Sequence, residues 1–172
     1  MADPRRTNPT ARICLTPRVH GVGGMVSFAH KLAAGLPQRG VQTPDDLADE
    51  PYQAVLVIGG TRQLNGLRRA RKHGARIVQR LDGMNWLHRM RGRGGPPSGI
   101  RHFLRAEYGN LILKLVRNHL ASQVVYQSRF VQGWWERAHG PTRVPSQVIY
   151  NGVDLGVYSP QGPQNPPTYR SR

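Results

Sequence analysis

What the sequence has little of narrows the class of protein. Cys14 is the only cysteine, which excludes a disulfide framework and a cysteine-based zinc site. No apolar stretch approaches the roughly 20 residues of a membrane-spanning helix, and the N-terminal residues lack the apolar core of a signal peptide. The seven histidines are scattered, without metal-ligand spacing. We therefore expect a cytoplasmic protein that holds no metal and buries Cys14 inside its first strand.

Acidic residues are also scarce. The chain has 9 Asp and Glu against 25 Lys and Arg, a formal net charge of +16, and only three of the basic residues are lysine. Such a charge favours an anionic partner, namely anionic lipid headgroups, a phosphorylated acceptor or nucleic acid. A GC-rich genome would produce the same arginine bias without any function. Composition alone leaves both readings open.

The 172 residues suffice for one domain with a core of its own. Short apolar runs alternate with helical patterns; we predict strands at 11–16, 54–58, 76–81, 123–127 and 147–150, and helices at 25–38, 63–73, 100–120 and after Ser128. The connections are too long for hairpins. The pattern therefore predicts an α/β protein, a single Rossmann-like domain whose mainly parallel sheet has helices on both faces.

Several segments depart from this alternation. The short acidic segment 41–51 predicts a reduced element where such folds often have another strand. Residues 1–10 and 161–172 are predicted to be a disordered arm and a disordered tail, and the Arg-, Gly- and Pro-rich stretch 89–99 a mobile loop. In the long helix, Leu104, Tyr108, Leu111, Leu115 and Val116 fall on one side.

Two glycine turns stand at opposite ends of the predicted domain. The first, Gly21-Val22-Gly23-Gly24, joins the first strand to a helix, whose N-terminal amides are suited to bind phosphate. Val26 occupies the place of the third glycine of the dinucleotide fingerprint, and no Gly-Lys-Ser/Thr follows, so a small Rossmann-like nucleotide binder is disfavoured. The second turn, Asn151-Gly152-Val153-Asp154, follows the last strand.

These turns, together with Ser128 and Phe130 after the fourth strand, resemble the N-terminal domain of a family 4 glycosyltransferase of the GT-B type over roughly residues 11–160. The resemblance implies one half of a GT-B fold. It also implies a metal-independent, retaining transfer of a sugar from a nucleotide sugar to a sugar or lipid acceptor. The nucleotide sugar is a co-substrate there, and no cofactor is expected.

The resemblance also implies which residues line or brace the cleft: Gly23, Gly24, Met25, Asp82, Ser128, Asn151, Gly152 and Asp154. Asp82 is the best catalytic candidate, because ligands of open α/β sheets bind beside the carboxyl ends of strands. A carboxylate there can orient sugar hydroxyls. A plain Asp-Gly turn explains Asp82 as well, and helix capping explains Ser128. Trp134 and Trp135 are expected in the core or at its edge.

One feature of the family is absent. Its donor-binding domain carries two glutamates separated by seven residues, but eight positions after the three glutamates, Glu50, Glu107 and Glu136, stand Ile58, Leu115 and Val144. We therefore expect an apparently truncated enzyme that is inactive alone, with a possible partner chain carrying the C-terminal domain. The alternative is a non-enzymatic basic α/β domain that binds polyanions, either nucleic acid or an anionic membrane surface at which the protein would be peripheral.

Overall fold

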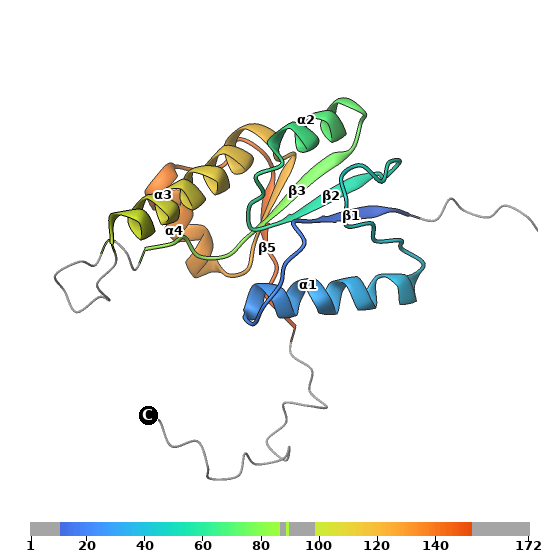
Figure 1. Ribbon diagram of the computed structural model, residues 1–172, viewed down its shortest axis with the longest axis horizontal. Coiled ribbons are helices and arrows are strands. Elements are labelled where there is room, and N and C mark those ends of the chain that lie inside the picture. The colour runs from blue at the N-terminus through green and yellow to red at the C-terminus, as the bar shows by residue number, and fades with distance from the viewer. Residues whose placement is uncertain (1–10, 87–88, 90–98, 153–172) are drawn as a thin grey trace, which may run out of the picture.

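The computed structural model describes residues 11–86, 89 and 99–152 (Figure 1). Strands and helices alternate along them in the order β1 (Ile13–Thr16), α1 (Gly24–Gly35), β2 (Ala54–Ile58), α2 (Leu64–Lys72), β3 (Arg76–Leu81), α3 (Ile100–Leu115), β4 (Gln123–Tyr126), α4 (Arg129–His139) and β5 (Ser146–Val148). A 3-10 turn, η1 (Pro37–Arg39), follows α1, and a π-helical turn, η3 (Val116–Leu120), extends α3. The predicted arm, the tail and most of the predicted mobile loop lie outside the described residues.

The described strands form a parallel sheet in the order β1-β2-β3-β4-β5. The other edge of β1 pairs with residues 42–44: the Ile13 N–H donates to the Gln42 carbonyl at 2.9 Å and the Leu15 N–H to the Pro44 carbonyl at 2.8 Å. This pairing is the reduced element expected within 41–51. The chain therefore leaves β1 toward one edge, then returns and builds the rest of the sheet on the other side of β1.

Helices cover both faces of the sheet. Figure 1 shows α1 on one face, with α2 and α3 on the other. On the second face Val55, Val57 and Ile77 are fully buried beneath α2, η3 and their neighbours. The five apolar residues of β2 suit a strand that is covered on both sides. The predicted fold class, an α/β Rossmann-like domain, is confirmed.

A second part of the core lies beneath α4, on the same face as α2 and α3. Trp135 is completely buried among Leu81, Tyr126 and Val131. Its indole Nε1 donates a hydrogen bond of 2.9 Å to the backbone carbonyl of Asp82. Trp135 is therefore in the core, as expected, whereas Trp134 is half-buried against Gly83 and contacts the rings of Trp86 and Phe130.

Some strand and helix boundaries differ from the predicted ones. A strand ends where no neighbouring strand is left to pair with it. The last strand ends at Val148 rather than at residue 150, because Tyr126 ends its neighbour β4. The first begins at Ile13 rather than at residue 11. The first helix, predicted over 25–38, ends at Gly35; η1 then leads to Gly40, whose φ of +73° stops the helical path.

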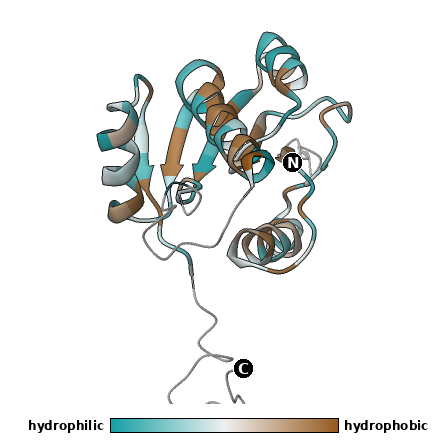
Figure 2. Cartoon of the chain, turned by 60° about the vertical axis from the view of Figure 1, so that its left-hand side comes forward, coloured by the Kyte–Doolittle hydropathy of each residue, from teal (hydrophilic) through white to brown (hydrophobic). Residues whose placement is uncertain are grey.

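Helix α3 is apolar on more than the side that faces the sheet. Ile112 and Val116 are buried, whereas Leu104, Tyr108 and Leu111 are exposed. In Figure 2 much of the apolar colour falls on the strands and on α3. Within the described ranges, no helix is long and apolar enough to cross a membrane.

Candidate functional site

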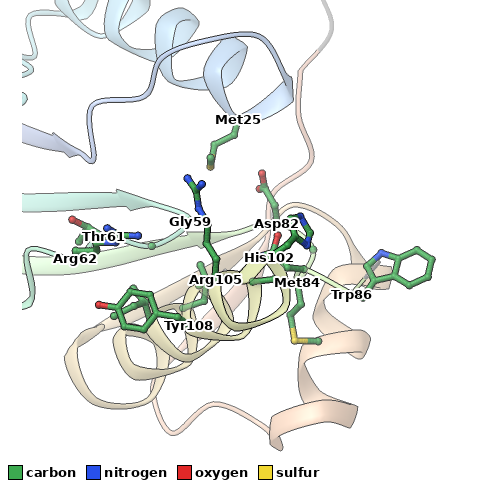
Figure 3. A pocket seen from close by; sticks show the side chains of 17 residues that line it. Met25, Gly59, Thr61, Arg62, Asp82, Met84, Trp86, His102, Arg105 and Tyr108 are labelled. Atoms are coloured by element: carbon green, nitrogen blue, oxygen red, sulfur yellow. The ribbon is translucent and has the colours of Figure 1, made fainter. Parts of the chain in front are cut away.

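A cleft of about 690 Å³ opens at the carboxyl ends of β2 and β3. Its walls come from the first turn of α1, from the loops after the two strands and from α3 (Figure 3). The residues that matter most for its chemistry are Met25, Gly60, Arg62, Asp82, His102 and Arg105. The position agrees with the topology, because ligands of open α/β sheets bind outside the carboxyl ends of the strands, near the switch point, which here lies between β1 and β2.

Two glycines after β2 form part of the cleft wall. Gly59 has a φ of +74°, and a Cβ there would lie 3.1 Å from the Met25 Sδ. A Cβ on Gly60 would lie 3.1 Å from Leu113 Cδ2 and 3.3 Å from Ile112 Cγ2. The pair therefore lets α1 and α3 approach the end of β2 closely. Sequence reasoning treated Gly59-Gly60 only as the end of a strand; its position after a buried run was the available signal.

Asp82 stands at the end of β3 with its carboxylate directed into the cleft (Figure 3). Its Oδ1 accepts a hydrogen bond from the Arg80 guanidinium, with which it forms an ion pair. Its backbone carbonyl accepts a hydrogen bond from the indole Nε1 of buried Trp135. The side chain keeps 28% of its surface exposed. Asp82 is thus fixed from the protein side and open toward the cleft.

Arg80 forms hydrogen bonds with two of the predicted site residues, Asp82 and Asn151. Its side chain is 4% exposed, and its Nη2 donates to Asn151 Oδ1 at 2.8 Å and to Gln127 Oε1 at 3.3 Å. The guanidinium carbon lies 3.9 Å from the centre of the Phe28 ring on α1. Sequence reasoning counted Arg80 only among the many arginines. An arginine near the end of a central strand, two residues before Asp82, was the signal for a buried partner.

Met25 lines the cleft opposite Asp82, and Asn151 reaches Asp82 through Arg80. The remaining predicted residues lie outside the cleft wall. Gly23 and Gly24 form the start of α1 next to Met25, with open space where a Cβ would stand.

Ser128 is the N-cap of α4, its Oγ accepting from the Val131 N–H at 3.2 Å, which confirms the capping prediction. Gly152 is exposed. Asp154 lies outside the described residues.

Cationic side chains that sequence reasoning left unassigned also line the cleft. The Arg62 guanidinium carbon lies 5.4 Å from the centre of the Tyr108 ring. Arg105 projects from α3 toward the space between Met25 and Asp82 (Figure 3). The side chains of Arg105 and His102 form no hydrogen bond or ion pair with another described residue. A carboxylate with free cations around it can hold a ligand that carries both hydroxyl groups and negative charge.

The geometry defines the class of this protein as a Rossmann-like α/β domain with an open cleft that holds a few polar side chains at the carboxyl ends of β2 and β3. Comparisons of the chain with protein-family models, with curated proteins and with solved structures find no match. Among the described residues, no three His, Cys, Asp or Glu side chains gather as a group that could hold a metal ion.

Proposed function

We propose that this domain is the acceptor-side, N-terminal domain of a retaining GT-B-type glycosyltransferase. It binds a sugar or lipid acceptor in the cleft at the ends of β2 and β3. A second domain, in the same protein or in a partner chain, presents the nucleotide sugar. The observation that carries the proposal is the carboxylate of Asp82, fixed by buried Arg80 and open to a cleft at the switch point of the sheet. The reaction would take place in the cytoplasm.

Each polar group of the cleft has a task in such a transfer. Asp82 accepts hydrogen bonds from acceptor hydroxyls and orients the one that attacks the anomeric carbon. Its negative charge also stabilises the positive charge that develops at that carbon. Arg105, which has no ionic partner among the described residues, faces the negative charge of the departing diphosphate. Fixed charges of this kind are usually the largest single contribution to catalysis in a water-poor site.

Acceptor binding is the part of the proposal that the chain can test alone. We would titrate the full chain with sugar and lipid-phosphate acceptors by NMR, and repeat the titration with Asp82→Asn. The amide oxygen can still accept from Arg80, so this variant removes the charge and keeps the hydrogen-bond acceptor. Because Arg80 is buried, circular dichroism must show that the variant is folded at the temperature of the titration. We expect at least about tenfold weaker binding, the loss of a charge-assisted hydrogen bond. Asp49→Asn, an exposed aspartate outside the cleft, is the matched control.

Transfer itself requires the donor domain. The coding sequence that adjoins this one should carry the motif of two glutamates separated by seven residues, and the combined protein should move labelled sugar from a nucleotide sugar. In that protein Asp82→Asn should lower turnover far more than stability. Acceptor binding that is unchanged in Asp82→Asn would overturn the proposal, and equal losses of folding and turnover would assign Asp82 to the scaffold.

A second candidate function is non-enzymatic binding of polyanions. The observation that favours it is helix α2, which carries Arg68, Arg69, Arg71 and Lys72 and has no acidic residue. If the partner is nucleic acid, the logarithm of the binding constant should fall linearly and steeply with the logarithm of the salt concentration. This should hold for any nucleotide sequence. Tight binding that changes little with salt would exclude this function.

A further inference from the structure

Helix α3 presents an apolar stripe to solvent. Ile100, Leu104, Tyr108 and Leu111 are spaced by four, four and three residues, and they are 64%, 60%, 45% and 50% exposed. We call these four side chains the α3 stripe. Ile112 and, at the start of η3, Val116 are buried instead. A helix with apolar residues on both sides needs a second apolar surface to cover the outer one.

The charges around the α3 stripe are almost all positive. Arg101, Arg105 and Lys114 are exposed on α3 itself. The acidic residue of α3, Glu107, forms an ion pair with Arg89 at 2.6 Å. Cations therefore flank an apolar band about 17 Å long, the rise of the helix from Ile100 to Leu111.

Helix α2 lies beside α3 on the same side of the sheet and adds to this charge (Figures 1 and 2). Arg68, Arg71 and Lys72 are exposed on it. Arg71 joins the two helices by donating to the His119 carbonyl at 2.8 Å. We call the outer surfaces of the two helices, including the α3 stripe, the α2–α3 face.

We propose that the α2–α3 face docks on an anionic lipid bilayer. Aliphatic side chains that enter the interface, flanked by arginine and lysine that meet lipid phosphates, are what an interfacial helix requires. Nucleic acid would use the cations but leave the α3 stripe uncovered. A second copy of the same face would bring like charges together. Of these occupants, the bilayer satisfies both the apolar and the charged parts.

Docking in this orientation also positions the cleft. Tyr108 belongs to the α3 stripe and lines the cleft, and Arg105 beside it projects into the cleft. A domain held by this face would therefore keep the mouth of the cleft next to the headgroups. The docking inference does not depend on glycosyl transfer, because it rests on the exposed residues of α2 and α3 alone.

The test is co-sedimentation of the full chain with vesicles of phosphatidylcholine, with and without phosphatidylglycerol. We expect binding to the anionic vesicles that weakens with salt. Leu104→Ser with Leu111→Ser should lower the partition coefficient at least about tenfold, because the two leucines leave the interface. Arg68→Gln with Lys72→Gln should lower it by about fivefold for each cation removed. None of these four residues lines the cleft.

Two control variants match the tested ones in charge and in polarity. Lys31→Gln with Arg39→Gln removes the same charge near α1, on the other face of the sheet, and Val22→Ser removes an exposed apolar side chain outside α3. Both should bind like the unchanged chain, and near-UV circular dichroism should show that all variants are folded. Three results would each overturn the proposal: no binding to anionic vesicles, binding that the α3 variant retains, or self-association without lipid that the α3 variant abolishes.

Discussion

Burying a guanidinium costs several kcal/mol of lost hydration unless protein groups replace the water. Arg80 replaces it with the carboxylate of Asp82, the side-chain oxygens of Asn151 and Gln127, and the face of the Phe28 ring. Four parts of the chain thus meet at one planar cation, whose fork of donors suits several acceptors at once. Arg80 therefore connects stability and the candidate site, because the same contacts fix Asp82.

Replacing Arg80 should destabilise the domain strongly. Arg80→Met keeps an unbranched side chain but leaves Asp82 and Asn151 without their donor, and we expect the free energy of unfolding to fall by about 3 kcal/mol. Urea unfolding followed by circular dichroism measures this. Arg76→Met, at the exposed start of the same strand, should change stability by less than about 0.5 kcal/mol. Equal effects of the two variants would show that the contacts of Arg80 contribute little.

Cys14 should be unreactive as long as the domain is folded. Its side chain is fully buried in β1, and burial, with smaller effects from Asp46, Asp45 and Asp49, raises the pKa of the thiol to about 12. A thiol-specific disulfide reagent should therefore label no cysteine in the native protein at mildly alkaline pH, and one per chain in urea. Rapid labelling without denaturant would show that β1 is not buried as described.

At the scale of elements, the apolar pattern predicted the central strands well. The bounds of β2 and β3 agree with the prediction because Gly59-Gly60 and Asp82-Gly83 mark where the two strands end. The edge strand β5 did not follow its own β-branched sequence, since a strand continues only where a neighbour pairs with it. Periodicity placed Leu104, Tyr108 and Leu111 on one side of the long helix together with Leu115 and Val116, but the first three are exposed and Val116 is buried. Periodicity does not tell which residues of an apolar side meet the sheet.

The cap of α4 gives a prediction at this scale. Ser128 Oγ accepts from the Val131 N–H, and the helix carries Trp135 into the core. Ser128→Ala should lower the free energy of unfolding by about 1 kcal/mol in thermal or urea unfolding, whereas Ser128→Asp should retain most of the stability. A loss of several kcal/mol in both variants would indicate a further role for this position.

The C-terminal end of α4 should make the domain sensitive to acid. Burial lowers the pKa of His139, and the nearby charges of Lys114, Arg117 and Arg89 lower it further. The unfolded chain therefore binds this proton at a higher pH than the folded one. The contribution to stability is complete above the ordinary pKa of 6.5 and is lost as the pH falls below it.

Unfolding experiments above and below that pH test the prediction. His139→Gln should reduce the loss of stability in acid, and His30→Gln, at an exposed position of α1, should leave it unchanged. If His139→Gln loses as much stability in acid as the unchanged chain does, His139 is not the group that causes the loss.

At the scale of the whole molecule, topology predicted the location of the candidate site better than motifs did. Asp82 and Met25 lie in one cleft because β3 and α1 both reach the switch-point edge of the sheet. Gly59, Gly60 and Arg105 were missed because their place depends on how closely α3 packs on β2. The hydrogen bond from Arg80 to Asn151 joins residues that are 71 positions apart, and no local sequence pattern predicts it.

The net charge of +16 should make stability depend on salt. Unlike a protein whose surface ion pairs balance, this chain holds a large excess of cations, which repel one another in the compact state. Raising the ionic strength from about 0.01 M to about 0.15 M shortens the screening length from about 30 Å to about 8 Å. The Tm of the full chain should therefore rise over this range, and Arg68→Gln with Lys72→Gln should rise less. The rise should be larger in mild acid, where the histidines add positive charge. A Tm that falls with salt would instead mean that ion pairs such as Arg18–Asp45 and Arg89–Glu107 outweigh the repulsion.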